Sequence, residues 1–145
     1  MASRDIRTAE LTLTRTIAAK PAAIFDRWLD IKKPGSPWFG VKKAILNAVV
    51  DGLFYHCVNF EDHDWAHYGR FVALDRPRRI EHTWVSEATK GLESVVTLTF
   101  EAQGAGTLVT LHHRNIPDDE MGRRHRDGWG YCLDALVQAL AGAKA

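Results

Sequence analysis

The sequence has few cysteines, no long apolar run and almost no net charge, and each absence excludes a class of protein. Only two cysteines, Cys57 and Cys132, occur in 145 residues, so there is no disulfide framework and no C-x-x-C zinc or redox motif. Lysine and arginine number 19 against 18 acidic residues, which argues against binding to nucleic acid or to an anionic membrane. No apolar stretch approaches the roughly 18 residues that a membrane span needs.

The first residues, MASRDIRTAELTLTRT, also lack the apolar segment of a secretory signal peptide. We therefore expect a cytoplasmic protein in which both cysteines are free thiols, with a disulfide between them as the alternative. Because the sequence has no glycine-rich phosphate loop, nucleophile motif or short metal-ligand spacing, we expect no metal and no other cofactor.

Aromatic residues, in contrast, are abundant: five Trp, six Phe and three Tyr. In a chain of this size they indicate an interior that is either tightly packed or hollow. Hydrophobic residues make up 46% and charged residues 26%, and no repeats or linkers occur. This composition predicts one globular domain over residues 1–145.

Alternation of apolar and polar residues predicts seven strands, most of them joined by short turns and therefore antiparallel. The predicted strands are 6–18, 42–50, 53–59, 65–74, 79–85, 93–102 and 107–114. In segment 65–74 two alternations compete, one with Val72 and Leu74 inward and one with Phe71 and Ala73 inward, so the inward face of this strand stays open.

Helical spacing follows Pro21, which predicts a short helix after the first strand, and a second short helix or a loop is expected around Trp38 and Phe39. A long amphipathic helix is predicted over 118–141, with Gly142 as its stop. Because this helix alone is long enough to cover the sheet, the sheet must curve around it. The element order predicts an α+β helix-grip fold, a seven-stranded curved antiparallel sheet wrapped around the C-terminal helix.

Five stretches resemble, in order, the START-like (SRPBCC) superfamily, and specifically its branch homologous to the activator of the heat-shock-protein-90 ATPase. They are LTRTIAAKPAAIFDRWLD, DGLFYH, GRFVALDRPRRIEHTW, VTLTFEAQGAGTLVTLHHRNIP and HRDGWGYCLDALVQAL, the last with a Gly128-Trp129 pair typical of the branch. The resemblance covers nearly the whole chain and implies a hydrophobic cavity between helix and sheet. The eukaryotic co-chaperone of this branch has an additional N-terminal domain, whereas this chain begins at the START-like strand, so we expect no co-chaperone role.

Strand parity identifies the residues that would line such a cavity. The predicted inward sets are Phe54, His56 and Val58; Ile80, His82 and Trp84; Val96, Leu98 and Phe100; and Val109, Leu111 and His113. The predicted ligand-binding residues are Trp38, Phe39, Phe54, His56, His82, Trp84, His113 and Trp129. We expect Trp38 and Phe39 to gate the entrance, and His63, His67 and His112 to lie on the surface.

The leading interpretation is the binding of a hydrophobic small molecule, such as a lipid, an aromatic or a polyketide-like compound. In this interpretation His56, His82 and His113 form a polar centre; the alternative is three separate histidines, each hydrogen-bonded to a backbone carbonyl or standing near the rim of the cavity. A cyclase or hydrolase using these histidines as acid or base is a second hypothesis, although no catalytic residue is assigned. A protein-interaction module related to chaperone ATPase activators is the third, and a homodimer stays open.

Overall fold

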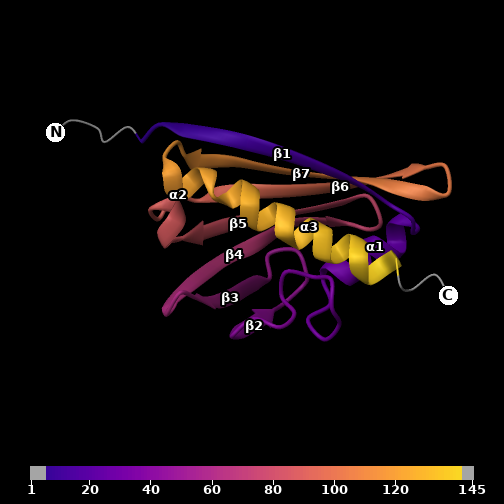
Figure 1. Ribbon diagram of the computed structural model, residues 1–145, viewed down its shortest axis with the longest axis horizontal. Helices are drawn as coiled ribbons and strands as arrows, with labels where there is room; N and C mark the ends of the chain where they lie inside the picture. The colour runs from indigo at the N-terminus through magenta and orange to yellow at the C-terminus, as the bar shows by residue number, and fades with distance from the viewer. Residues whose placement is uncertain (1–5, 142–145) are drawn as a thin grey trace.

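The computed structural model describes residues 6–141, in which seven strands form one antiparallel sheet (Figure 1). The strands are β1 (Thr8–Ile17), β2 (Lys43–Leu46), β3 (Leu53–Phe60), β4 (His63–Asp75), β5 (Arg79–Ser86), β6 (Ser94–Gln103) and β7 (Gly106–Pro117). Their order across the sheet is β1-β7-β6-β5-β4-β3-β2, so only β1 is placed away from its neighbours in sequence. The predicted α+β helix-grip fold with a seven-stranded sheet is confirmed.

The helices are α1 (Pro21–Trp28), the 3-10 turn η1 (Glu87–Thr89), α2 (Glu120–Arg123) and α3 (His125–Ala141). Figure 1 shows α3 running diagonally across one face of the sheet, with β4, β3 and β2 extending beyond it. Of the two alternatives for the segment around Trp38 and Phe39, a second short helix or a loop, the structure shows the loop, so only one short helix, α1, lies between β1 and β2. Segment 30–42 is a series of turns, because Pro34, Pro37 and Gly35 (φ 114°) interrupt any helical run.

The predicted continuous helix over 118–141 is also interrupted, at Arg124, and its expected stop at Gly142 lies outside the described residues. The Asp119 carboxylate caps α2 by accepting from the Gly122 N–H at 2.8 Å. Gly122 lies so close to β7 that a Cβ atom would stand 1.8 Å from the Pro117 carbonyl oxygen. The first turn is therefore held against the end of β7, and α3 starts anew after it.

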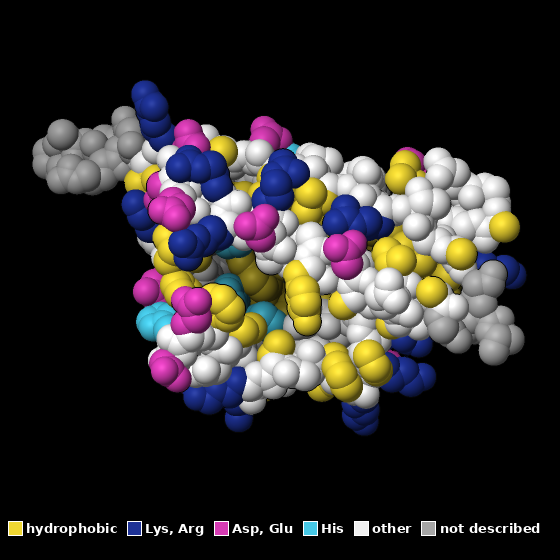
Figure 2. All heavy atoms as spheres, viewed as in Figure 1, with side chains coloured by type: hydrophobic (Ala, Val, Ile, Leu, Met, Phe, Trp, Pro, Cys, Tyr) yellow, Lys and Arg dark blue, Asp and Glu magenta, His cyan; other side chains and the backbone are white. Residues whose placement is uncertain are grey.

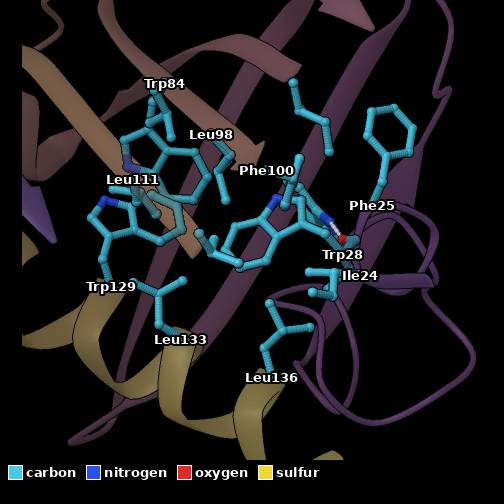
Figure 3. Close-up of a cluster of buried hydrophobic side chains, with 14 of the residues drawn as sticks. Ile24, Phe25, Trp28, Trp84, Leu98, Phe100, Leu111, Trp129, Leu133 and Leu136 are labelled. Carbon is cyan, nitrogen blue, oxygen red and sulfur yellow. Dashed lines mark hydrogen bonds between the residues drawn. The ribbon is translucent and has the colours of Figure 1, made fainter. Parts of the chain in front are cut away.

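The hydrophobic core lies between α3 and the sheet (Figure 3). Figure 3 shows Trp129 and Leu133 of α3 pointing toward Trp84, Leu98 and Leu111, while Leu136 lies beside Ile24 and Trp28 of α1. All members of the inward sets predicted for β5, β6 and β7 are at most 4% exposed, which confirms the parity argument for these strands. In β3, Phe54 and His56 are buried and Val58 is half-buried.

A β-bulge explains why β4 shows two competing alternations. Phe71 lies opposite His82 and Leu74 opposite Ile80, but the register shifts between Phe71 and Ala73. Phe71 is fully buried and Leu74 packs against the core, whereas Val72 between them is 36% exposed. The extra residue moves the inward face from one parity to the other within the strand.

Two further predictions concern the cysteines and the membrane. Cys57 and Cys132 are both free thiols, as expected, and burial raises the pKa of Cys132 to about 12. Over residues 6–141, no helix has the length and apolar character that a membrane crossing requires.

Candidate functional site

Seven of the eight predicted ligand-binding residues lie together in one group, packed ring against ring. Neighbouring ring centroids are 5.1 Å apart for Trp38 and Phe54, 5.0 Å for Phe54 and His82, and 4.9 Å for Trp84 and Trp129. His56 and His113 complete the group. The eighth residue, Phe39, stands apart with 42% of its surface exposed. Aromatic side chains therefore fill most of the predicted interior.

The face that carries α3 is hollowed beside the helix. Figure 2 shows this hollow below α3, with hydrophobic and histidine side chains at its bottom. Five histidines lie around Trp84 and Trp129, and we refer to these seven residues as the histidine–tryptophan cluster: His56, His67, His82, His113, His125, Trp84 and Trp129. Its half-buried histidines are His67 and His125, while His82 and His113 are fully buried.

His113 belongs to a hydrogen-bond chain whose direction is fixed. The indole N–H of Trp129 donates to His113 Nδ1 at 3.0 Å, so that nitrogen carries no proton. His113 Nε2 therefore carries the proton and donates to Ser94 Oγ at 2.7 Å. The Ser94 hydroxyl in turn donates to the Trp84 carbonyl oxygen. Every polar atom in this chain is satisfied.

The same chain shows that Ser94 and His113 are not a nucleophile and base, despite their short separation. A general base must present a lone pair to the hydroxyl, whereas His113 Nε2 presents a proton to Ser94. Both residues are also fully buried. His113 is therefore a structural histidine in this arrangement, held in one tautomer by α3.

His56 and His67 lie directly opposite each other on β3 and β4. His56 Nε2 donates to the Pro37 carbonyl oxygen at 2.8 Å, which leaves His56 Nδ1 as an acceptor. His67 Nδ1 lies 3.2 Å from His56 Nδ1 and 3.2 Å from the His56 carbonyl oxygen, so its proton is shared between them. The ring of His67 stacks on Trp84 with centroids 4.6 Å apart.

Two polar nitrogens of the cluster are buried without a partner among the described residues. His82 Nδ1 donates to the Thr83 carbonyl oxygen at 2.8 Å, so His82 Nε2 is a pure acceptor, and it has no donor. Trp84 Nε1 is a donor and has no acceptor. Leaving such a group unpaired in the interior costs about 1–3 kcal/mol.

Burial keeps the cluster histidines neutral at physiological pH. Removal from water lowers the pKa of all five, because the charged form loses its hydration. The pKa falls to about 4 for His67 and for His82. For His67, the charges of protonated His56 and His125 add to the effect of burial.

The prediction that His67 lies on the surface is wrong, because His67 is half-buried, and His125 was not among the predicted ligand-binding residues. His63 is exposed and pairs with Glu87, and His112 faces away from the core and pairs with Glu10. His67 differs because β4 begins at His63, which places His67 opposite the inward residue His56. The described part of the chain has no group of three or more His, Cys, Asp or Glu side chains arranged to hold a metal ion.

Comparison with solved structures finds the same fold in other proteins. A protein from Chromobacterium violaceum superimposes with a TM-score of 0.75 at 20% identity, covering 91% of this chain and 97% of that one. An uncharacterised protein from Rhizobium leguminosarum superimposes with a TM-score of 0.76 at 19% identity, covering 97% of this chain and 99% of that one. An Hsp90 activator from Plasmodium falciparum superimposes with a TM-score of 0.71 at 20% identity, covering 92% of this chain and 96% of that one.

Comparison at the level of sequence gives the family. Among curated proteins, none matches this chain. The family model described as "Activator of Hsp90 ATPase homolog 1-like protein" matches residues 18–141, which span all the strands after β1 and every helix. The resemblance to this branch of the START-like superfamily is thereby confirmed, and the chain belongs to the family of activator of Hsp90 ATPase homolog 1-like proteins.

Proposed function

We propose that this protein binds a small, mainly apolar molecule with one hydrogen-bonding group in the hollow beside α3. The hollow lies where α3 leaves β4 and β3 uncovered, and its bottom is hydrophobic with a few histidines. A concave apolar surface with a small number of fixed polar groups is the usual design of a small-molecule site.

The unpaired nitrogens Trp84 Nε1 and His82 Nε2 carry this proposal. One is a donor and the other an acceptor, and both belong to β5, on the inward face of the strand. A hydroxyl group accepts one hydrogen bond and donates another, so a phenol or alcohol is the ligand chemistry that satisfies these atoms. A pure hydrocarbon leaves both of them unpaired.

The aromatic walls supply the apolar part of the binding energy. Trp84 is the centre of the layer, stacked on His67 and packed against Trp129. A flat ring placed over such side chains gains from offset or edge-to-face contacts, worth about 0.5–1.5 kcal/mol for each pair beyond the buried area. This favours an aromatic ligand over a flexible chain.

Of the two residues expected to gate the entrance, only Phe39 is exposed. The Trp38 indole N–H donates to the Trp28 carbonyl oxygen at 2.8 Å, and its ring is 2% exposed. Trp38 therefore forms part of the wall, and Phe39, 42% exposed beside it, is the residue that covers or uncovers the site in this proposal.

Titration calorimetry with 1-naphthol and with naphthalene tests the proposal. We expect 1-naphthol to bind more tightly, by about tenfold for one hydrogen bond of roughly 1.4 kcal/mol. Trp84→Phe removes the N–H and keeps an aromatic ring, and should abolish most of this preference. Trp65→Phe is the matched control, because Trp65 packs on His63 outside the cluster. Equal affinity of both probes for the unchanged protein contradicts the proposal.

A second candidate function, contact with an Hsp90-class ATPase, is favoured by the outer face of the sheet. Ile45, Tyr55, Tyr68 and Val85 lie opposite one another across four neighbouring strands and form one lateral row. Tyr68 is 55% exposed, and Leu53 beside the row is 65% exposed. Continuous exposed apolar residues on a soluble domain mark interaction surfaces.

Stimulation of the ATPase of an Hsp90 homologue measures this second function. Leu53→Ser and Tyr68→Ser should then reduce the stimulation while leaving 1-naphthol binding intact, because the row lies on the face opposite α3. Absence of any stimulation by the unchanged protein excludes it.

A further inference from the structure

The two directly opposed histidines of the β3–β4 hairpin have the spacing of metal ligands. His56 Nδ1 and His67 Nδ1 are 3.2 Å apart. Two nitrogens bound to one tetrahedral Zn²⁺ at the usual bond length of about 2.05 Å are separated by about 3.3 Å. The hairpin therefore already holds the two nitrogens at the distance that a shared cation requires.

The surroundings of His56 orient it as a ligand. Its Nε2–H donates to the Pro37 carbonyl oxygen at 2.8 Å, which fixes the tautomer and directs the Nδ1 lone pair toward His67. Histidines that bind metals commonly donate their other ring N–H to a backbone carbonyl in this manner. His67 is held from the other side by its stacking on Trp84.

We infer that His56 and His67 form a two-nitrogen binding site for a borderline divalent transition-metal ion such as Zn²⁺, Ni²⁺ or Cu²⁺. Neutral imidazole suits these ions, whereas Mg²⁺ and Ca²⁺ prefer oxygen ligands. The cation takes the place of the proton on His67 Nδ1. That proton moves to His67 Nε2, so His67 stays neutral and no group is oxidised or reduced.

The remaining coordination positions fall to water or to another small ligand. No third histidine, cysteine or carboxylate joins the pair within residues 6–141, so the protein supplies two ligands rather than the three or four of a resident zinc site. His67 is half-buried, which gives the ion access from solvent.

Zinc titration of the full chain at pH 7.5 by calorimetry tests this inference. We expect one Zn²⁺ per chain, and about tenfold or more weaker binding after His67→Ala. His63→Ala is the matched control, since His63 lies on the same strand but is exposed and paired with Glu87. Mg²⁺ at the same concentration should give no heat of binding.

Tryptophan fluorescence provides a second readout that does not depend on the heat of binding. Cu²⁺ bound at His67 lies next to the Trp84 ring and should quench part of the emission in the unchanged protein and in His63→Ala, but not in His67→Ala. Circular dichroism of His67→Ala shows whether the variant is folded, and His67→Gln repeats the test with a side chain closer in size. Zinc affinity unchanged in both folded His67 variants, or lost equally in His63→Ala, overturns the inference.

Discussion

The indole N–H of Trp129 donates to His113 Nδ1 across 3.0 Å and thereby joins α3 to β7 by a hydrogen bond of fixed direction. Both residues are buried, Trp129 at 4% exposure and His113 at 0%. The bond sets the tautomer of His113, which in turn fixes the proton that His113 gives to Ser94. This one contact between α3 and β7 thus determines where the protons lie along the hydrogen bonds that link Trp129, His113 and Ser94.

Replacing Trp129 with phenylalanine tests the strength of this contact. Trp129→Phe keeps an aromatic ring but leaves His113 Nδ1 as an unpaired buried acceptor, so the free energy of unfolding should fall by about 1–3 kcal/mol beyond the loss of ring volume. Urea unfolding at pH 7 measures the change.

Trp28→Phe is the control for that experiment. Trp28 is also fully buried, but its Nε1 has no partner among the described residues, so the substitution removes no hydrogen bond. Trp28→Phe should therefore lower the free energy of unfolding by less than Trp129→Phe does. An equal or greater loss in Trp28→Phe contradicts the role assigned to the Trp129–His113 bond.

Acid should destabilise the protein well before its carboxylates are protonated. The pKa of His82 is about 4 in the folded state against 6.5 for a free imidazole, so the unfolded chain takes up a proton first as the pH falls. The stability due to this difference is complete above pH 6.5 and is lost as the pH falls through about 4. For fully buried His82 alone the loss is about 3 kcal/mol.

Unfolding free energies measured from pH 7 to pH 4 check this effect. Between pH 7 and pH 4, the free energy of unfolding should fall by about 3 kcal/mol less in His82→Phe than in the unchanged protein. Asp26, Glu81 and Asp119 have lowered pKa values in the fold, and their contributions are lost only at still lower pH. Parallel curves for the two proteins would show that His82 does not titrate as described.

Two glycines near the start of the C-terminal helices should respond in opposite ways to alanine. A Cβ atom at Gly122 meets the Pro117 carbonyl oxygen at 1.8 Å, so Gly122→Ala must displace α2 from β7 and should destabilise the fold by several kcal/mol. At Gly128, nothing lies within 4 Å of the new atom. Gly128→Ala should therefore stabilise α3 by about 0.5–1 kcal/mol through helix propensity. Thermal unfolding of both variants measures the contrast.

The fold can be predicted from the sequence because its two strongest signals, strand alternation and helical spacing, each extend over a whole element. Alternation over β5, β6 and β7 identifies the inward residues, such as Leu98 and Leu111, and the stripe on α3 identifies Trp129 and Leu133. These elements bury one face each, so a single parity describes the whole element. The bulge at Val72 breaks this condition in β4, and no alternation can describe a strand whose inward face changes along its length.

The pair of His56 and His67 was missed because the turn before β4 is shorter than its composition suggests. Four polar residues, 61–64, suggest a long turn, but Glu61 and Asp62 alone form it, with φ of 54° and 62°. A two-residue turn pairs Phe60 with His63 and therefore His56 with His67. A turn longer by two residues shifts this register and separates His56 from His67. The length of the turn therefore determines whether the two histidines pair.

The indole N–H resonance of Trp84 during a titration with 1-naphthol is the most direct test of the proposed ligand site. Trp84 Nε1 has no partner among the described residues, whereas the N–H groups of Trp38 and Trp129 are already bonded. We expect the Trp84 signal to move downfield in step with saturation, because its N–H gains an acceptor, while the Trp65 signal stays in place. A Trp84 signal that does not move as the protein is saturated with 1-naphthol contradicts the account.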